Sequence, residues 1–458
     1  MRIRVLVPFA LATLLSGACS SSGDGAATEP TAAEESAAST TTAAGDAGVD
    51  DPAPLDPTLP DEVALPIVFV HGFAGSAQQF ESQAMRFVAN GYAPERIVAY
   101  DHDGSGMDIE AYTAGLAEVV DGTLERFSVE QVYLVGHSRG TFVSSEYLAA
   151  PERAAKVAKY VALDGRPCVE TVACVAITRA TLPGQAHVEV ATSPESFVAQ
   201  FEFLVGATPA VVDLEVQRGP VEVSGRAVNF PLNTGRSGAT LNVYELVSAT
   251  GQRRTPTAIH SEVLGEEGTF GPIVLGAGAH YEYELVSPDS EVVHHLYPQP
   301  SLRSSQWMRL LTSTPEGTTR LNTNTGDAHT SLIAMRMREW YGDGDSADSL
   351  TVSTDGGEPV EVITDFVANG AIGLHLHDDA LTPGVSTLGP LEFFAAQPFQ
   401  SGIDVFIPAS PGGSGTVTVT NLPRGDDSRP QVLNVPRWPS SGHAISVVFS
   451  DWPVDGAV

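Results

Sequence analysis

The chain has 458 residues, with 24 Lys and Arg against 56 Asp and Glu, and a formal net charge of −32 at pH 7. A chain this acidic repels polyanions at long range, which argues against nucleic acid as a partner. Its hydrophobic fraction of 42% is enough to bury substantial cores, and its length predicts about two or three domains.

The N-terminal segment has the pattern of an export signal. Arg2 and Arg4 precede an apolar stretch at 5–15, and small residues lead to Cys19, as in a bacterial lipoprotein signal. We predict a signal peptide at 1–18, lipidation of Cys19, and membrane attachment of an exported cell-envelope lipoprotein; an ordinary signal peptide cut nearby is the alternative. Residues 19–60 have no apolar period, which predicts a flexible acidic linker.

Two further cysteines lie close together, at Cys168 and Cys174. In an exported protein this spacing favours a short disulfide loop, although two buried thiols are the alternative. No cysteine spacing resembles a zinc or redox motif, and we predict no metal and no cofactor.

The segment 61–207 alternates strand and helix patterns. Short apolar strands are predicted at 67–70, 97–100, 132–135 and 160–163, and helices at 78–90, 108–127, after Ser138, and from Ser193 to Gly206. This alternation predicts a parallel sheet with helices on both faces.

The sequence Gly136-His137-Ser138-Arg139-Gly140 follows the third strand and precedes a helix. This is the G-x-S-x-G pattern in which small glycines allow the sharp turn that exposes a nucleophilic serine, here Ser138. The oxyanion donors expected with it are the backbone N–H of Arg139 and an N–H of the loop after the first strand, for which we predict Phe73. We expect His71 to shape that loop and to take no part in proton transfer.

The other two members of a catalytic triad follow in chain order. Asp164 ends the fourth strand and is the predicted acid, since Glu170 is the only other carboxylate between Gly165 and Ala186. His187 is the predicted base, because it lies on a loop between a strand-like segment and the next helix. A structural aspartate and a surface histidine are the alternative interpretations.

Four motifs resemble those of the α/β-hydrolase lipases, including the archaeal alkaline lipases that carry a C-terminal all-β extension. They are Val70-His71-Gly72-Phe73-Ala74-Gly75-Ser76, Gly136-His137-Ser138-Arg139-Gly140-Thr141, Leu163-Asp164-Gly165 and His187-Val188-Glu189-Val190-Ala191-Thr192-Ser193. The resemblance places the triad on Ser138, Asp164 and His187 and implies that the β extension contributes to lipid binding. Arg139 is a departure, since an apolar residue is usual there. The segment from Asp164 to His187 is short, which leaves little room for a lid.

Beyond 208 the sequence reads as strands separated by Gly, Pro, Asn and Asp turns. We predict two antiparallel β domains, at 208–344 and 345–458, the first beginning with a transthyretin-like sandwich, and one short helix near 331–341. The segments 375–379 and 343–348 contain ligand-type side chains, but neither has the spacing of a metal site. Arg424-Gly425-Asp426 reads as a turn.

These features predict an exported, membrane-anchored carboxylic ester hydrolase, a lipase or esterase that acts through an acyl-enzyme. Its partner would be an ester or lipid substrate, and the sequence does not define an oligomeric state. The alternative is a surface binding lipoprotein whose β modules bind lipid or carbohydrate and whose hydrolase domain is vestigial. Proteolysis of amides is a third option.

Overall fold

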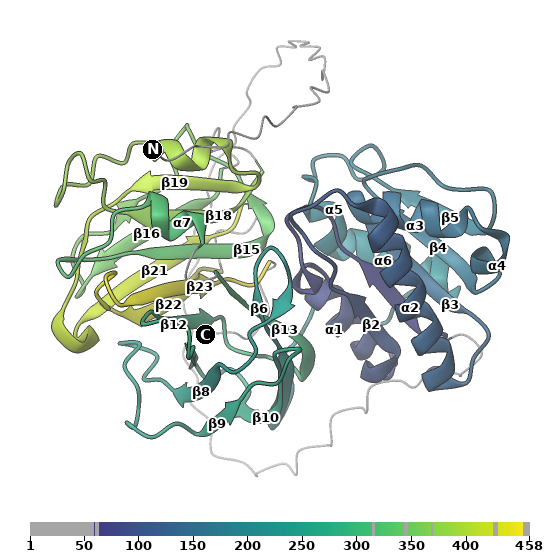
Figure 1. Ribbon diagram of the computed structural model, residues 1–458, viewed down its shortest axis with the longest axis horizontal. Coiled ribbons are helices and arrows are strands. Elements are labelled where there is room, and N and C mark those ends of the chain that lie inside the picture. The colour runs from purple at the N-terminus through teal and green to yellow at the C-terminus, as the bar shows by residue number, and fades with distance from the viewer. Residues whose placement is uncertain are drawn as a thin grey trace, which may run out of the picture. The chain divides into compact units, whose positions relative to one another are not determined.

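The computed structural model describes residue 59 and residues 64–313, 317–342, 347–367, 370–424 and 429–451 (Figure 1). The predicted signal peptide, Cys19 and nearly all of the predicted linker lie outside the described residues. Among the helices that are described, none is both long and apolar enough to cross a membrane.

The N-terminal domain is built on a five-stranded parallel sheet in the order β2-β1-β3-β4-β5. The strands are β1 (Ile67–Val70), β2 (Ile97–Tyr100), β3 (Val132–His137), β4 (Val157–Leu163) and β5 (Ala173–Ile177). Alternate side chains enter different cores, since Ile67 and Phe69 lie in one and Val68 and Val70 in the other. Both faces are therefore buried, as apolar parallel strands require.

Helices cover the two faces of this sheet. They are η1 (Ala77–Phe80), α1 (Glu81–Ala89), η2 (Pro94–Arg96), α2 (Ile109–Phe127), α3 (Arg139–Leu148), α4 (Pro151–Ala154), α5 (Glu189–Thr192) and α6 (Pro194–Val205). Phe87 of α1 and Phe201 of α6 pack in the first core, while Leu116 of α2 and Val143 of α3 pack in the second. The predicted sheet with helices on both faces is confirmed.

The remainder of the chain, called the β region here, forms four sheets. Its strands are β6 (Pro220–Asn229), β7 (Thr234–Gly235), β8 (Thr240–Glu245), β9 (His260–Val263), β10 (Thr269–Gly276), β11 (Tyr281–Val286), β12 (Val293–Pro298), β13 (Ser305–Thr312), β14 (His329–Thr330), β15 (Leu332–Trp340), β16 (Ser349–Thr354), β17 (Val360–Glu361), β18 (Ala371–His377), β19 (Gln400–Asp404), β20 (Ile407–Pro408), β21 (Thr416–Leu422), β22 (Gln431–Pro436) and β23 (His443–Val448). Three short helices join them: α7 (Thr318–Asn322), η3 (Glu392–Ala396) and η4 (Pro411–Gly413). Most pairings are antiparallel, so the predicted β-rich character is confirmed.

Two expectations for the β region need correction. The predicted helix near 331–341 is strand β15, because pairing with β18 and β23 buries this segment and overrides the helix propensity of its Met, Arg and Ala residues. The predicted division near Gly344 falls outside the described residues. The strands on either side of it do not separate there, since one eight-stranded sheet runs β19-β18-β15-β23-β12-β11-β8-β9 and combines both predicted β domains.

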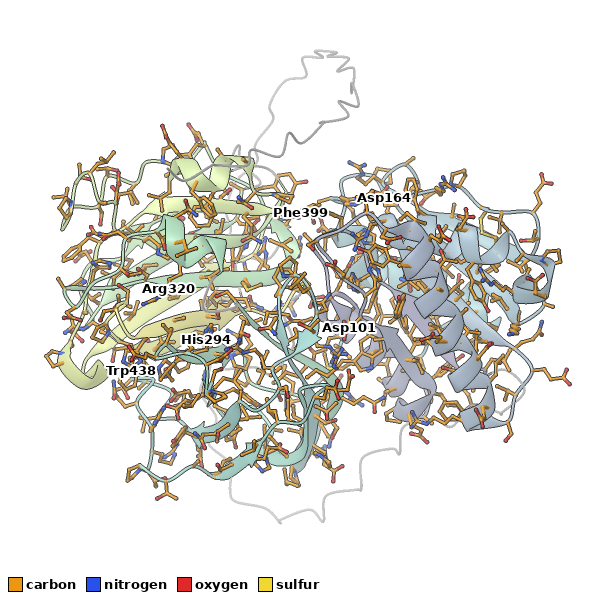
Figure 2. All side chains as sticks on the ribbon, in the orientation of Figure 1. Asp101, Asp164, His294, Arg320, Phe399 and Trp438 are labelled. Atoms are coloured by element: carbon orange, nitrogen blue, oxygen red, sulfur yellow. A yellow bond between two sulfur atoms is a disulfide. The ribbon has the colours of Figure 1, made fainter. Side chains whose placement is uncertain are left out.

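The β region contacts the N-terminal domain directly. Asp101, which follows β2, pairs with Arg226 of β6 at 3.1 Å and with Arg309 of β13 at 2.8 Å (Figure 2). Trp307 of β13 packs edge-on against Phe69 of β1, with ring centroids 5.6 Å apart. Polar and apolar contacts from β6 and β13 therefore hold the β region against the hydrolase-like sheet.

Candidate active site

Ser138 occupies a strained turn between β3 and α3. Its φ of 53° and ψ of −119° place a non-glycine residue in a conformation that L-residues rarely adopt. The turn is tight because glycines flank it: a Cβ on Gly140 would lie 2.1 Å from the Val70 carbonyl oxygen. Ser138 remains partly exposed although its neighbours are buried. The local sequence therefore folds into the expected nucleophile turn.

Asp164 and His187 form a hydrogen-bonded pair. The Nδ1–H of His187 donates to Oδ2 of Asp164 at 2.6 Å, and Arg179 contacts the same oxygen at 2.8 Å. Burial raises the pKa of Asp164, but the hydrogen bonds from His187 and from the Arg179 backbone outweigh this and lower it to about 2. The carboxylate is thus ionised at neutral pH, and Nε2 of His187 is left free to accept a proton.

The serine turn and the acid–histidine pair lie next to each other. The Ser138 N–H donates to the Leu163 carbonyl at 3.0 Å, and a Cβ on Gly165 would lie 2.7 Å from the Ser138 carbonyl oxygen. The Nε2–H of His137 donates to the carbonyl of His187 at 2.9 Å, with the two rings 4.7 Å apart. The structure therefore brings the three predicted triad residues together.

His137 has a supporting role that the sequence did not reveal. Burial lowers its pKa to about 3, so its ring is neutral near pH 7. The neutral ring bridges two segments, because Nδ1 accepts from the Gln79 side chain at 2.5 Å while Nε2–H binds the His187 carbonyl. The G-x-S-x-G pattern specifies no residue type at this position, so no sequence signal identified the bridge.

The loop predicted to supply oxyanion donors lies against Ser138. A Cβ on Gly72 would come within 2.9 Å of the Ser138 Cβ, so only glycine allows this approach. Among the described hydrogen bonds, the backbone N–H groups of Phe73 and Arg139 have no acceptor. Both predicted donors are therefore available to a ligand beside Ser138.

His71 lies inside that loop, away from the reacting atoms. It is 1% exposed, its Nδ1–H donates to the Gly72 carbonyl at 2.8 Å, and its ring stacks on His102 at 3.9 Å. Burial lowers its pKa to about 4. His71 thus occupies the position of a neutral structural residue.

The Arg139 side chain does not project toward a substrate. Its guanidinium is buried between the rings of Phe73 and Tyr112 and donates to backbone carbonyls of the 103–106 loop, among them that of Asp103 at 2.6 Å. Arg139, which stands where an apolar residue is usual, therefore anchors the 103–106 loop through these hydrogen bonds.

The β region supplies site residues that sequence analysis missed. Nδ2 of Asn233 donates to the carbonyls of Gly75 and His102, each at 2.9 Å. The ring of Phe399 lies parallel to that of His187 within 13°, with centroids 6.4 Å apart (Figure 2). Asn233 directly precedes β7 and Phe399 directly precedes β19, so both lie far along the chain and belong to no local motif.

Backbone strain gathers around this site. Eight non-glycine residues have positive φ in the described part of the chain. Four of them are Ser138, Asp164, Asn233 and Phe399, and a fifth is Ala74, which directly follows Phe73 and donates its N–H to the Gly104 carbonyl at 2.8 Å. Such strain persists only where surrounding contacts impose it, and it is concentrated at active sites.

Cys168 and Cys174 form a disulfide in the structure, across the loop that joins β4 to β5. This loop follows Asp164 and precedes the strand whose end carries Arg179. The disulfide therefore restricts the conformation of the loop that follows Asp164.

The two candidate metal segments differ in what the structure describes. In the first, His375 is buried and hydrogen-bonds Gln400 at 2.7 Å. In the second, residues 343–346 lie outside the described residues. Elsewhere in the described chain, Glu282, Glu284 and His295 converge, but Arg253 already binds both carboxylates.

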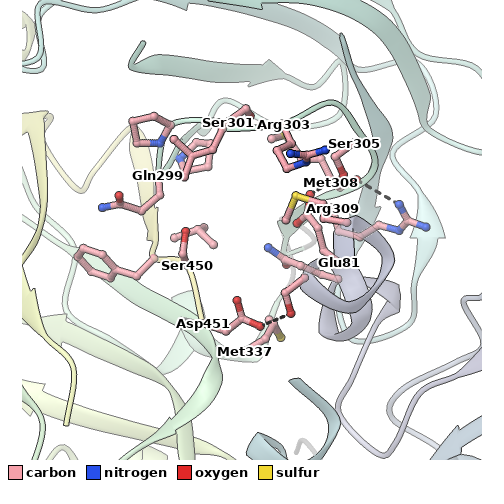
Figure 3. A pocket seen from close by; sticks show the side chains of 18 of the residues that line it. Glu81, Gln299, Ser301, Arg303, Ser305, Met308, Arg309, Met337, Ser450 and Asp451 are labelled. Carbon is pink, nitrogen blue, oxygen red and sulfur yellow. Dashed lines mark hydrogen bonds between the residues drawn. The ribbon is translucent and has the colours of Figure 1, made fainter. Parts of the chain in front are cut away.

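A small cavity of about 110 Å³ lies between α1 and the β region, away from Ser138 (Figure 3). Glu81, Arg309 and Asp451 line it. Burial raises the pKa of Glu81, whose carboxylate accepts a hydrogen bond from Ser305 at 2.8 Å. None of the predicted site residues is among its described lining residues.

Family models match three consecutive parts of the chain. The alpha/beta hydrolase fold matches residues 66–214, the lipase C-terminal domain matches residues 219–315, and another C-terminal-domain family matches residues 318–453. The last two meet between β13 and α7, and not near Gly344.

Individual relatives are similar over about a quarter of the chain. A non-heme chloroperoxidase from Streptomyces lividans is 32% identical over 113 residues, 23% of this chain and 38% of the relative. Another from Burkholderia pyrrocinia is 31% identical over 123 residues, 25% of this chain and 37% of the relative. The chain thus spans well under half the length of these relatives.

Among solved structures, an esterase from Rhodococcus sp. ECU1013 is 22% identical, covering 31% of this chain and 54% of that one with a TM-score of 0.19. The sheet, the serine turn and the family matches agree that the chain contains a domain of the alpha/beta hydrolase fold, followed by a region that matches the lipase C-terminal domain.

Proposed function

We propose that the protein is a serine ester hydrolase with Ser138 as nucleophile, His187 as general base and Asp164 as the residue that orients the histidine. The observation that carries this proposal is the strained Ser138 turn beside a His187–Asp164 hydrogen bond of 2.6 Å. The family match to a lipase C-terminal domain supports an ester as the bond cleaved.

The mechanism follows from these positions. Ser138 Oγ attacks the ester carbonyl carbon while its proton passes to Nε2 of His187. The resulting oxyanion accepts hydrogen bonds from the N–H groups of Phe73 and Arg139. The tetrahedral intermediate collapses, the alcohol leaves with the proton from His187, and water activated by the same histidine then releases the carboxylic acid from Ser138.

A larger cavity supports a substrate with an apolar part. It has a volume of about 460 Å³, is lined mainly by the β region, and reaches Ala74 of the oxyanion loop. Phe230, Leu232 and Ile333 are among its apolar residues, and Arg320 is its single Arg (Figure 2). No Asp or Glu is among its described lining residues, although the chain has 56. Ser, Thr, Gln and His residues share this lining with the apolar ones. Apolar surface of this kind accommodates an acyl chain, and a lining without carboxylates does not repel the acid product.

The test is turnover of p-nitrophenyl butyrate by the wild type and by Ser138→Ala. The variant is expected to lose turnover by a factor on the order of 10⁴ or more while its melting temperature stays unchanged, because Ser138 is partly exposed. Unchanged turnover in the variant would contradict the proposal. Absence of turnover in the wild type would favour the binding lipoprotein with a vestigial hydrolase domain.

We also propose that the enzyme is exported and tethered through a lipid on Cys19. The support is the sequence alone: basic residues, an apolar stretch and small residues that end at Cys19. Growth of a bacterial expression strain with an alkyne-tagged palmitate is expected to label the wild type and not Cys19→Ser. Label in both, or in neither, would contradict lipidation at this residue.

A further inference from the structure

The turn that carries His187 is bound on both sides by carboxylates. On one side, the Ala186 N–H donates to Oε2 of Glu189 at 3.0 Å. On the other, the N–H groups of Val188 and Glu189 both donate to Glu339, one to each carboxylate oxygen, the second at 3.0 Å. Glu339 is 1% exposed and lies on β15, about 150 positions further along the chain. A residue of the β region therefore holds the backbone next to the proposed base.

The Glu189 carboxylate belongs to a buried ionic network. Glu189 pairs with Arg338 at 2.9 Å and with Arg424 at 2.7 Å. Arg424 also pairs with Asp348 at 2.8 Å, which in turn pairs with Arg336 at 2.7 Å. Glu339 joins this network through its backbone carbonyl, which accepts hydrogen bonds from Arg336 at 2.8 Å and from Arg424. Opposite charges thus compensate one another where an isolated buried charge would be costly, and they fix the side chains in place.

The shape of β15 brings these side chains together. Its pairing with β18 shifts register between Met335 and Trp340, so the intervening residues depart from a regular ladder. Such irregularities redirect side chains and are frequent beside active sites. Within this stretch Arg338 reaches Glu189 while its neighbour Glu339 reaches the N–H groups after His187.

Each oxygen of Glu339 accepts a different N–H, so the interaction requires two acceptors. Burial raises the pKa of Glu339, while the hydrogen bonds from Val188 and Glu189 act in the opposite direction and favour the carboxylate. Glutamine at this position would offer one acceptor and would turn its amide donor toward an N–H group. Glu339→Gln therefore disturbs the two hydrogen bonds to the His187 turn while it keeps a side chain of the same length.

We propose that Glu339 is a positioning residue that sets the placement of His187, so that the β region completes the catalytic geometry of the hydrolase domain. This inference rests on the proposed role of His187 as the base. The ring of Phe399, also from the β region, is nearly parallel to the partly buried His187 ring with centroids 6.4 Å apart, while Glu339 accepts hydrogen bonds from the backbone that follows His187. Contacts from the β region thereby add to those of Asp164 and His137 in placing the histidine.

The test compares Glu339→Gln with Glu361→Gln in the full chain. Glu361 on β17 is the control because its exposed carboxylate also accepts two backbone N–H groups, those of Leu350 and Ile363, but both at Oε1, an acceptor that glutamine retains. Active sites are counted by fluorophosphonate labelling, and kcat per labelled site and KM are measured with p-nitrophenyl butyrate. Glu339→Gln is expected to lower kcat per site roughly 10- to 100-fold with KM within about twofold, since small displacements of a catalytic group cost this much. Glu361→Gln is expected to match the wild type.

A purely structural role would lower the melting temperature or the fraction of labelled protein and leave kcat per site unchanged, and that result overturns the proposal. Should Glu339→Gln fail to fold, Glu339→Asp gives the same comparison, because it retains the charge but is one methylene shorter.

A second readout does not depend on ester turnover. The downfield proton resonance of the His187 Nδ1–H, assigned by its loss in Asp164→Asn, is expected to shift or broaden in Glu339→Gln and not in Glu361→Gln. An unchanged resonance overturns the positioning role. A shifted resonance in a protein without esterase activity would retain the positioning role and reject the proposed function.

Discussion

The serine turn and the histidine turn are held in place by different parts of the molecule. Close glycine contacts among residues 70–165 set the position of Ser138, all of them within the hydrolase domain. The turn around His187 and the loop of Phe73 depend on Glu339 and Asn233, which lie in the β region. The nucleophile is therefore positioned within its own domain, while the turn that carries His187 and the loop that carries Phe73 also depend on contacts from the β region.

This difference explains why the β region contacts the hydrolase domain at its functional loops. Gly104, in the loop bound by Arg139, donates its N–H to the Pro231 carbonyl at 2.7 Å. Asn233, two residues later, binds the oxyanion loop. A hydrolase sheet alone would keep its strained serine and lose these restraints on the groups around it.

The largest effect is expected at Asp164, which connects the two halves of the site. Asp164→Asn should lower kcat by about 10⁴-fold, because the amide stabilises the wrong tautomer of His187. Ester turnover at saturating substrate measures this. Arg179→Gln is the control: it removes the exposed partner of Asp164 but leaves the histidine bond, and its loss should stay within about tenfold. A similar loss in both variants would contradict the role given to the His187–Asp164 bond.

On the hydrolase side, Gly140→Ala should destabilise the fold. The added Cβ would lie 2.1 Å from the Val70 carbonyl oxygen, so α3 and β1 must separate. We expect a loss of about 1–3 kcal/mol or more in the free energy of unfolding, measured by urea denaturation. Gly122→Ala in α2 has no atom within 4 Å of its new Cβ and should stabilise by about 0.4–1 kcal/mol. Equal changes in the free energy of unfolding in Gly140→Ala and Gly122→Ala would contradict a steric requirement for glycine at position 140.

On the β side, Asn233→Gly should slow catalysis with little change in stability. Glycine tolerates the φ of 58° but lacks the amide that binds Gly75 and His102, so the oxyanion loop loses its restraint. We expect a roughly tenfold lower kcat, which is smaller than the loss caused by removing an oxyanion donor altogether, because the donor is only displaced. Ser128→Gly, at a φ of 52° on the far end of α2, is the control and should keep wild-type kcat. A stability loss at unchanged kcat would show that Asn233 serves folding alone.

The smallest effect is the pH dependence of stability at Asp164. Its pKa is about 2 in the folded protein against 3.8 in the unfolded chain, so the ionised group stabilises the fold above pH 3.8. This contribution is lost as the pH falls through about 2. The difference in unfolding free energy between wild type and Asp164→Asn should therefore be constant above about pH 5 and shrink toward pH 2. A difference that does not vary over this range would contradict the lowered pKa.

Much of the hydrolase domain was predictable because its signals are local. Strand and helix periods, the glycines around Ser138 and the caps at Asp108 and Ser193 each act over a few residues, and both caps are present. Asp164 and His187 were predictable because the triad follows in the order Ser, Asp, His along the chain. Asp164 comes at the end of a predicted strand, and His187 lies on a loop before a predicted helix.

The β region was less predictable because its order is set by long-range pairing. The segment 332–340 has the composition of a helix, and only its partners β18 and β23 make it a strand. Arg424 read as part of a turn, yet it pairs with Glu189 about 235 positions earlier. No local pattern could connect Glu339 to the turn that follows Ala186.

The most direct test of the whole account is the site and rate of fluorophosphonate labelling in the full chain. Mass spectrometry of the labelled wild type should find a single adduct, on Ser138. In His187→Ala the adduct should form more slowly by a factor on the order of 100 or more, because the serine loses its base. An adduct on another residue, or equal rates in the two proteins, would contradict a nucleophile at Ser138 activated by His187.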